Sequence, residues 1–412
     1  MNIRGCILAV WLAGGVALAW GADWPQFLGP ERTGATLGEG LAEVWPKEGP
    51  PVLWRKAVGQ GYAGAAVKDG RVVLFHRVGD SEVLDCLNVD EGSGIWSHRY
   101  PASYRNGYNP DHGPRAVPAI ADDRVFSMGA NGSIRCLDFK TGKEIWAVEA
   151  AAAFGSRTSF FGLACSPLVD GDAVMLSIGG AEGAGVIALD KRDGKLLWKA
   201  TDQEADYSAP TMATLHGRRV ALFFLREGLF GLDPKTGGTV FKFRWRSRIQ
   251  ASVNAATPVV VGNRIFLTSS YDTGDNLLEV AKDNGLKSVW SGDSFASQYA
   301  TPIHKEGHLY GLAGRHDSRE GTSPRCVDLA TGRILWTKPG MKAAAMIMAG
   351  ETLLVLRESG ELVRFKATPA EPAISGRAQI LGTGVRAQPA LADGRFLARD
   401  TRAFVCVDLR AK

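Results

Sequence analysis

The sequence predicts an all-β fold, an eight-bladed propeller of four-stranded antiparallel blades, and two observations support this prediction. The 412 residues include 50 glycines and 11 tryptophans, an excess that favours many tight turns with aromatic anchors over long helices. A segment of the type Asp-x-x-x-Gly-x-x-x-Trp returns along the chain at a nearly constant interval. Hydrophobic residues make up 45% of the chain, which allows a sizeable core and excludes a disordered or fibrous protein.

The first 21 residues have the layout of a secretory signal peptide. Arg4 precedes an uncharged run over residues 7–20, and small residues stand at Ala17, Ala19 and Gly21. This run is too short to span a bilayer comfortably, so we expect cleavage after Ala19 or Gly21, with an uncleaved anchor as the alternative. No later segment reaches ~18 consecutive apolar residues. We therefore expect a periplasmic or secreted protein with no transmembrane segment after cleavage. A leader over residues 22–49 is expected to follow the signal peptide.

The aromatic residue at the end of each copy gives the period of the repeat. Taking the docking aromatic residues as equivalent gives a mean spacing of about 47 residues, the length of one four-stranded propeller blade. These aromatic residues are Trp54, Trp96, Trp146, Trp198, Phe241, Trp290 and Trp336. The beginnings of the repeats agree, because six of them carry a proline that opens an apolar run, at Pro118, Pro167, Pro210, Pro258, Pro302 and Pro389. Two further copies begin near residues 65–66 and 345–346, which makes eight.

Each copy is expected to form four short strands. In the second copy they fall near residues 116–121, 124–128, 133–138 and 144–149. Asp138 can accept hydrogen bonds from the backbone of the turn that follows, and Gly142 supplies a backbone conformation that other residues avoid. The Trp four residues after this Gly lies on the outermost strand, where its ring can cover the gap between neighbouring sheets.

The two ends of the repeat region complement each other. The final copy supplies strands near 387–392, 395–399 and 403–409 but lacks a fourth, whereas residues 51–57, with Trp54, precede the first full blade. We expect this N-terminal strand to complete the last blade and close the ring. The predicted propeller spans residues 50–412. The boundaries of its seventh blade stay open, because residues 361–366 lack both the docking Asp and the Trp.

The repeat resembles the pyrroloquinoline-quinone (PQQ) repeat superfamily of β-propellers. Its docking pattern, Ala-x-Asp-x-x-x-Gly-x-x-x-Trp, is matched from Ala188 to Trp198, and the resemblance covers residues ~50 to 409. The leader Asp23-Trp-Pro-Gln-Phe-Leu-Gly-Pro is similar to the Trp-Pro-Gln-Phe-Arg-Gly-Pro opening of PQQ-like propellers that are abundant in planctomycetes. The resemblance implies the fold but no single activity. The superfamily includes calcium-dependent quinoprotein alcohol dehydrogenases, the BamB-type propeller of the outer-membrane assembly machinery and members with no assigned reaction.

For the dehydrogenases, the resemblance implies PQQ beneath a vicinal Cys-Cys disulfide, with calcium held by Glu, Asn and Asp. This chain has no Cys-Cys pair and no Cys-x-x-Cys-His haem motif. Four of its cysteines share one repeat position that needs a small buried side chain, which favours structural thiols over redox chemistry. The cysteines after the leader are Cys86, Cys136, Cys165, Cys326 and Cys406. No cofactor is therefore predicted outright, and PQQ with calcium stays open.

The histidine pair His304 and His308 does not predict a metal site. The two residues are four apart, a spacing that brings side chains together on a helix, but here the segment reads as strand, turn and strand. No metal ligand is predicted elsewhere in the chain.

Ligand-binding residues are expected on the face that carries the variable loops. These loops include residues 98–115, 154–161, 271–275 and 315–320. Arg and Tyr at the mouth of a central funnel suit an anionic or planar polar ligand, and the alternative is that these long side chains fill a tapering channel. The candidate residues around the funnel are Asp111, His112, Arg115, Arg157, Tyr207, Asn254, Tyr299 and Arg386.

The predicted function is that of an exported, non-catalytic binding or scaffold protein of the cell envelope. We expect a monomer whose partner is an envelope protein or a small polar or anionic ligand. The 48 basic and 43 acidic residues are interspersed, so no nucleic-acid partner is expected. The alternative is a PQQ- and calcium-dependent alcohol or polyol dehydrogenase, with Asp111, His112 or Asp206 as candidate bases. A third hypothesis is the sensor part of a larger assembly.

Overall fold

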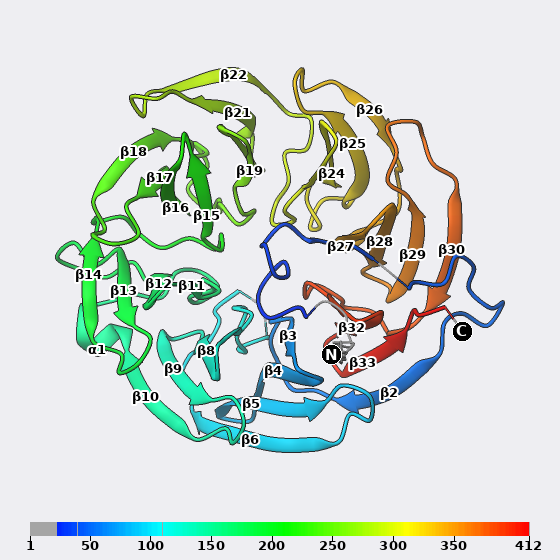
Figure 1. The fold of residues 1–412 in the computed structure, drawn as a ribbon, viewed down its shortest axis with the longest axis horizontal. Coiled ribbons are helices and arrows are strands. Elements are labelled where there is room, and N and C mark those ends of the chain that lie inside the picture. Colours follow the sequence, from blue (N-terminus) through cyan, green and yellow to red (C-terminus); the bar gives the residue numbers. More distant parts are fainter. Residues whose placement is uncertain (1–22, 39, 109, 412) are drawn as a thin grey trace, which may run out of the picture.

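Eight separate sheets, each with four antiparallel strands, surround a central axis in the computed structural model, which describes residues 23–38, 40–108 and 110–411 (Figure 1). The predicted eight-bladed all-β propeller is confirmed. The predicted signal peptide at residues 1–21 lies outside the described residues. Helix α1 (Ala150–Phe154) is the single α-helix in the described ranges, and it is too short to cross a membrane.

The first six blades follow one another in chain order, each running from the axis outward. The first blade has β3 (Ala65–Lys68), β4 (Arg71–Val78), β5 (Ser81–Asn88) and β6 (Gly94–Pro101). The second has β7 (Ala119–Ala121), β8 (Arg124–Met128), β9 (Ser133–Asp138) and β10 (Glu144–Glu149). The third has β11 (Leu168–Asp170), β12 (Ala173–Ser177), β13 (Val186–Asp190) and β14 (Leu196–Ala200).

The next three blades repeat this order. The fourth has β15 (Thr211–Leu215), β16 (Arg218–Leu225), β17 (Gly228–Leu232) and β18 (Thr239–Arg244). The fifth has β19 (Val259–Val261), β20 (Arg264–Ser269), β21 (Gly274–Val280) and β22 (Leu286–Gly292). The sixth has β23 (Ile303–Lys305), β24 (His308–Ala313), β25 (Ser323–Asp328) and β26 (Ile334–Thr337).

The last two blades include segments from the N-terminal part of the chain. The seventh has β27 (Ala343–Ala349), β28 (Thr352–Arg357), β29 (Glu361–Lys366) and β30 (Ile374–Gln379), and β1 (Ala35–Thr36) adds a parallel strand to β27. The eighth has β31 (Ala390–Ala392), β32 (Arg395–Arg399) and β33 (Ala403–Asp408). Its outermost strand is β2 (Val52–Ala57), which pairs antiparallel with β33. The predicted ring closure by the N-terminal strand is therefore confirmed.

Indole rings link neighbouring blades, as the repeat predicted. In six blades the Trp on the outermost strand donates a hydrogen bond from Nε1 to a backbone carbonyl of the next blade, at 2.8–3.1 Å. Gly142, in the turn before β10, has a φ of 70° and faces the ring of Trp96. A Cβ at Gly142 would lie 2.5 Å from that ring. Glycine is needed there both for the positive φ and for the close approach of the indole.

In the seventh blade, the leader supplies the missing indole. In the second blade, Trp146 on the outermost strand pairs with Cys136. The equivalent pair in the seventh blade is Gly376 with Arg364, so Gly376 occupies the position of the Trp. The ring of Trp45 covers this place, because a Cβ at Gly376 would lie 3.0 Å from it. The Arg364 guanidinium lies 5.5 Å from the centre of the same ring. This contact explains how a copy without its own Trp still forms a regular blade.

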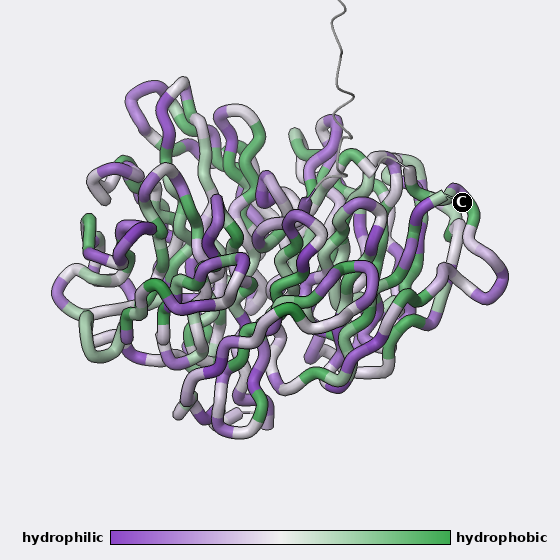
Figure 2. The backbone as a smooth tube through the Cα atoms, turned by 60° about the horizontal axis from the view of Figure 1, so that its bottom comes forward, coloured by the Kyte–Doolittle hydropathy of each residue, from purple (hydrophilic) through white to green (hydrophobic). Residues whose placement is uncertain are grey.

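The rest of the leader lies across the centre of the ring (Figure 1, dark blue). Trp24 is 1% exposed and forms backbone hydrogen bonds with Val67 of β3 in both directions. Arg32 is 5% exposed, and its guanidinium donates to Gln26 Oε1 at 2.9 Å, to the Pro210 carbonyl at 2.8 Å and to the Pro167 carbonyl. These bonds join the leader to the innermost edges of the third and fourth blades. Figure 2 shows hydrophobic residues running through the body of the ring and hydrophilic residues at many of its turns.

We expect the substitution Arg32→Ala to lower the free energy of unfolding by about 3 kcal/mol, because it leaves buried carbonyl oxygens without a donor. The measurement is chemical denaturation followed by tryptophan fluorescence. Glu31→Ala is the matched control, since the neighbouring Glu31 is exposed and its loss should change stability by less than about 0.5 kcal/mol. Equal stability of the two variants would contradict the anchoring role of Arg32.

Candidate functional site

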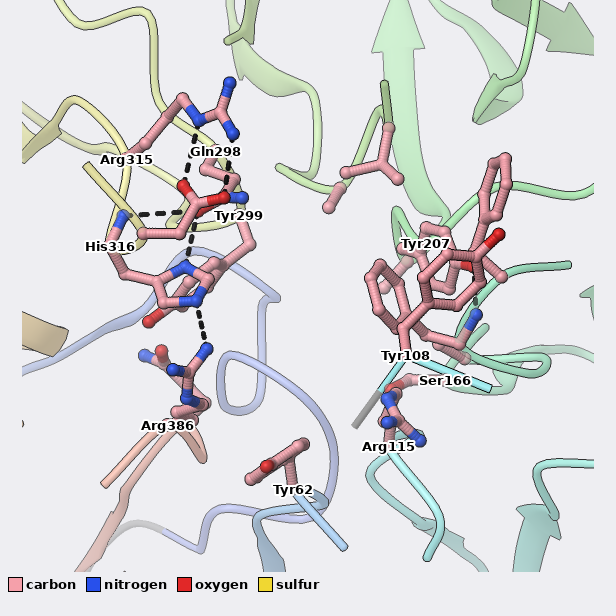
Figure 3. A pocket seen from close by; sticks show the side chains of 18 of the residues that line it. Tyr62, Tyr108, Arg115, Ser166, Tyr207, Gln298, Tyr299, Arg315, His316 and Arg386 are labelled. Atoms are coloured by element: carbon pink, nitrogen blue, oxygen red, sulfur yellow. Dashed lines mark hydrogen bonds and ion pairs between the residues drawn. The ribbon is translucent and has the colours of Figure 1, made fainter. Parts of the chain in front are cut away.

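A cavity of about 420 Å³ lies at the centre of the ring, on the side of the loops that connect one blade to the next (Figure 3). We call it the central funnel. Loops from most blades contribute to its lining, and Phe27 of the leader lines it as well. Of the eight residues predicted from the sequence, four line the funnel: Arg115, Tyr207, Tyr299 and Arg386. All four lie in loops that precede the innermost strand of a blade.

One side of the funnel is polar and is built mainly by the loop between β24 and β25. Arg315 and Asp317 form a two-pronged ion pair, with Nε–Oδ1 at 2.9 Å and Nη2–Oδ2 at 2.7 Å. The Arg315 guanidinium also lies 4.3 Å from the centre of the Tyr271 ring. The single carboxylate in the lining is thus neutralised by the arginine two residues before it.

His316 connects Gln298 and Arg386 on this polar side. Its Nδ1 forms a hydrogen bond with Gln298 Oε1, and its Nε2 with Arg386 Nη1. Burial and the positive charge of Arg386 lower the pKa of His316 to about 4, so the ring is neutral at neutral pH. A neutral ring fits both bonds, with Nδ1–H donating to Gln298 and Nε2 accepting from Arg386. Gln298 is held in turn, because its Nε2 donates to the Tyr271 hydroxyl at 2.9 Å.

The opposite side of the funnel is aromatic. Tyr108 packs edge-on against Phe160 and Phe161, with ring centres 5.4 and 5.7 Å apart. Phe161 continues to Tyr207, with ring centres 5.7 Å apart. The Tyr207 hydroxyl accepts a hydrogen bond from the Phe161 backbone at 2.7 Å and bonds to Ser159 Oγ at 2.6 Å. Tyr207 therefore orders the wall formed by the segment after α1.

The funnel carries positive charge that its lining does not neutralise. Arg115 donates from Nη1 to the Gly113 carbonyl at 2.9 Å, whereas its Nη2 is buried with no hydrogen-bond partner in the described part of the chain. Arg386 contacts a neutral imidazole. The two guanidinium carbons lie 5.4 and 5.9 Å from the centre of the Tyr62 ring. The funnel thus presents two arginines near one aromatic ring, an arrangement suited to an anion.

The other four predicted residues do not line the funnel. Asp111 is 8% exposed, and its carboxylate accepts from the backbone N–H of Gly61 and Gly113 at 2.8 and 3.0 Å. His112 Nδ1 accepts from the Asn106 backbone at 2.9 Å. Asn254 donates to the Leu225 carbonyl and accepts from Ser269 Oγ, both at 2.9 Å. Arg157 is exposed. The first three hold loops in place behind the lining.

Several lining residues were not among the eight. Arg315, His316 and Gln298 belong to or contact the loop over residues 315–320, which the sequence did mark as a variable loop. Phe27 lies in the leader and carries no repeat signal. Tyr62 stands three residues before Ala65, the same repeat position that Arg115 holds before Pro118, so the period could have placed Tyr62 at the axis.

Asp206, a candidate base, is also outside the lining. It is 5% exposed and accepts from the backbone N–H of Asn254 at 2.9 Å and of Tyr207 at 3.2 Å. The nearest charged group is Arg226, whose Nη1 lies 3.8 Å from Oδ2. Burial raises the pKa of Asp206 to about 7. This carboxyl group joins two loops of neighbouring blades and does not face the cavity.

The described residues do not fit the calcium and disulfide arrangement that the family resemblance implied for dehydrogenases. Within those residues, no three His, Cys, Asp or Glu side chains gather where they could hold a metal ion, whereas calcium needs six to eight oxygen ligands. The cysteines at 86, 136, 165, 326 and 406 are buried and unpaired. Burial raises the pKa of Cys86 to about 12, which makes its thiol unreactive at neutral pH.

Comparison with known proteins identifies relatives that include outer membrane assembly factors, a tetrathionate hydrolase and quinoprotein dehydrogenases. The family described as outer membrane protein assembly factor BamB matches residues 79–338. An outer membrane protein assembly factor BamB from Burkholderia pseudomallei is 36% identical over 295 residues, 70% of this chain and 68% of that protein. A quinoprotein ethanol dehydrogenase from Pseudomonas aeruginosa is 25% identical over 295 residues, 64% of this chain and 47% of that protein. The chain therefore spans about half the length of that dehydrogenase.

The fold is shared with solved propellers. The crystal structure of BamB from Moraxella catarrhalis has a TM-score of 0.62 to this structure, at 18% identity, over 86% of this chain and 96% of that one. At this level of identity the likeness shows the fold alone.

We expect the Asp206 carboxyl group to make stability depend on pH. Its pKa is raised from an ordinary value near 3.8 to about 7 by folding, so the folded state binds the proton more tightly than the unfolded state does. Its stabilising contribution is complete below pH ~4 and is lost as the pH rises through about 7. Thermal unfolding between pH 4 and 8 should show a falling midpoint, and Asp206→Asn should flatten the fall. Identical slopes for the two proteins would contradict this assignment.

Proposed function

The chain belongs to the family of outer membrane protein assembly factor BamB, and from this premise we propose that it is a non-catalytic binding protein of the cell envelope whose ligand site is the central funnel. The ligand class that the geometry favours is a small organic anion. The predicted signal peptide supports an envelope location, and the family of the relatives agrees with it.

One observation carries this proposal: two funnel arginines face no carboxylate of the lining. Arg115 has a buried Nη2 without a partner in the described residues, and Arg386 contacts the neutral ring of His316. Leaving a charged donor buried and unpaired costs free energy that a bound anion would recover. A fork-shaped guanidinium binds carboxylate or phosphate oxygens in pairs, so such ligands fit best.

The residues that line the funnel give little support to the hypothesis that it is an active site. Asp317 is occupied by Arg315, and both ring nitrogens of His316 take part in hydrogen bonds. The candidate bases Asp111, His112 and Asp206 lie outside the lining. A general base has to reach the proton it removes, and these groups point into loops instead. The described residues also give little support to a calcium-dependent quinoprotein, because they do not bring together the carboxylates that would hold the calcium ion.

A scaffold role for protein partners is the second candidate, and family membership favours it. The relative from Burkholderia pseudomallei is named for outer membrane protein assembly. The long loops around the funnel give a partner a large surface on the same face. A scaffold and a ligand receptor are compatible, because a partner that covers this face would also cover the funnel.

The test is calorimetric titration of the full-length mature protein with citrate, phthalate, glucose 6-phosphate and PQQ, each with and without calcium. We expect saturable, calcium-independent binding of at least one of these anions, with a raised thermal unfolding midpoint. Arg115→Gln should weaken that binding about tenfold or more. Arg319→Gln is the control, since Arg319 is exposed and outside the lining.

Two results would overturn the proposal. Binding of none of the four anions would remove the funnel as an anion site and leave the scaffold role. PQQ binding that requires calcium would support the dehydrogenase instead and would justify a screen of alcohols.

A further inference from the structure

We propose that the central funnel selects an aromatic carboxylate, with Arg386 as the anchor of the carboxylate and the wall of Tyr108, Phe160 and Phe161 as the contact of its ring. This inference rests on the proposed function and makes it more specific. It concerns a ligand that needs neither a metal ion nor a second charge.

The separation of the funnel into two halves is the first step. Figure 3 shows Arg315, Gln298, His316 and Arg386 on one side of the cavity and Tyr108, Tyr207 and Arg115 on the other. Val117 and Val253 add further apolar side chains to the lining. A ligand that fills the cavity therefore meets hydrogen-bond donors at one end and, at the other, a mainly aromatic surface with Arg115 beside it. Small polar anions would leave the apolar half in contact with water, which is unfavourable.

The orientation of Arg386 is the second step. The chain of contacts from Tyr271 through Gln298 and His316 ends on Nη1 of Arg386. In the described part of the chain this is the one hydrogen bond of the Arg386 side chain, so Nε and Nη2 remain available. Those two groups form the edge of the guanidinium that binds a carboxylate through two parallel hydrogen bonds. His316 is therefore a positioning residue: it holds the anchor without contributing charge.

The geometry around Tyr62 is the third step. Its ring has the Arg386 guanidinium carbon 5.9 Å from its centre and that of Arg115 at 5.4 Å. Arg115 also lies 5.9 Å from the centre of Phe161, on the aromatic side. A planar guanidinium can stack on an aromatic ring as well as pair with an anion. Arg115 is thus placed to stack on the aromatic ring of the ligand, while Arg386 is placed to bind its carboxylate.

Charge and size give the fourth step. The funnel contains three arginines and one carboxylate, so a divalent cation is repelled from it. The cavity of about 420 Å³ falls within the range of roughly 300–1,000 Å³ that is usual for small-molecule sites. A bicyclic aromatic monocarboxylate is a suitable probe for such a cavity.

The test compares 2-naphthoate with its neutral analogue 2-naphthylmethanol and with acetate, by calorimetric titration of the full-length mature protein at pH 7.5. We expect 2-naphthoate to bind without calcium. Loss of the charge in 2-naphthylmethanol, or of the ring in acetate, should weaken binding at least tenfold. Arg386→Gln should weaken naphthoate binding about 10- to 100-fold, because a charge-assisted pair is lost. Arg319→Gln, on the same loop as His316, should leave it unchanged.

A second pair of variants tests the positioning role of His316. His316→Gln keeps an oxygen that can accept from Arg386, whereas His316→Leu keeps bulk without an acceptor. We expect the Leu variant to lose the preference for naphthoate over naphthylmethanol and the Gln variant to retain most of it. Equal preference in both variants would remove His316 from the argument, and circular dichroism of each variant checks that the fold is intact.

The outcomes separate this inference from the proposed function. Binding of citrate or glucose 6-phosphate without binding of naphthoate would overturn the aromatic-carboxylate inference and leave the anion site standing. Equal binding of naphthoate and naphthylmethanol would also overturn it, since Arg386 would then select nothing. If neither naphthoate nor any of the four anions binds, both proposals fail.

Discussion

The docking of an indole from one blade on a turn of the next is the interaction on which the rest of this structure depends. Each blade alone exposes two apolar faces, and the hydrogen bond from Trp Nε1 to the neighbouring turn sets how one sheet lies on the other. Under five of these rings a glycine is as necessary as the indole, because any side chain at Gly142 or Gly194, for example, would meet the ring.

The leader completes the ring where the repeat is incomplete. Trp45 covers the seventh blade at the place of a missing indole, β2 supplies the fourth strand of the eighth blade, and β1 adds to β27. The same segment brings Arg32 against the innermost edges of two blades and Phe27 into the lining of the funnel. Closure of the ring and formation of the central funnel are therefore not independent. Loss of leader contacts should affect both, because the same backbone segment takes part in each.

The described lining of the central funnel differs from the calcium and disulfide arrangement that the family resemblance implied for dehydrogenases. A shared frame with a quinoprotein dehydrogenase does not require a shared cofactor site, since function resides in the loops and not in the blades. Here the lining combines unneutralised guanidinium groups with an aromatic wall. The carboxyl groups that could have suggested catalysis, at Asp111 and Asp206, accept backbone hydrogen bonds that hold the loops. Their burial serves the shape of the site.

The sequence by itself determined the number of blades, their strands and the closure of the ring. These features follow from a period of turns and aromatic residues that is local in the chain. It also pointed to Arg115, Tyr207, Tyr299 and Arg386, because each lies just before an innermost strand. Tertiary structure alone decided that Asn254 and His112 support loops, that Phe27 reaches the axis, and that His316 meets Arg386. The last contact joins two different blades, and the others depend on how irregular segments fold, which the repeat does not encode.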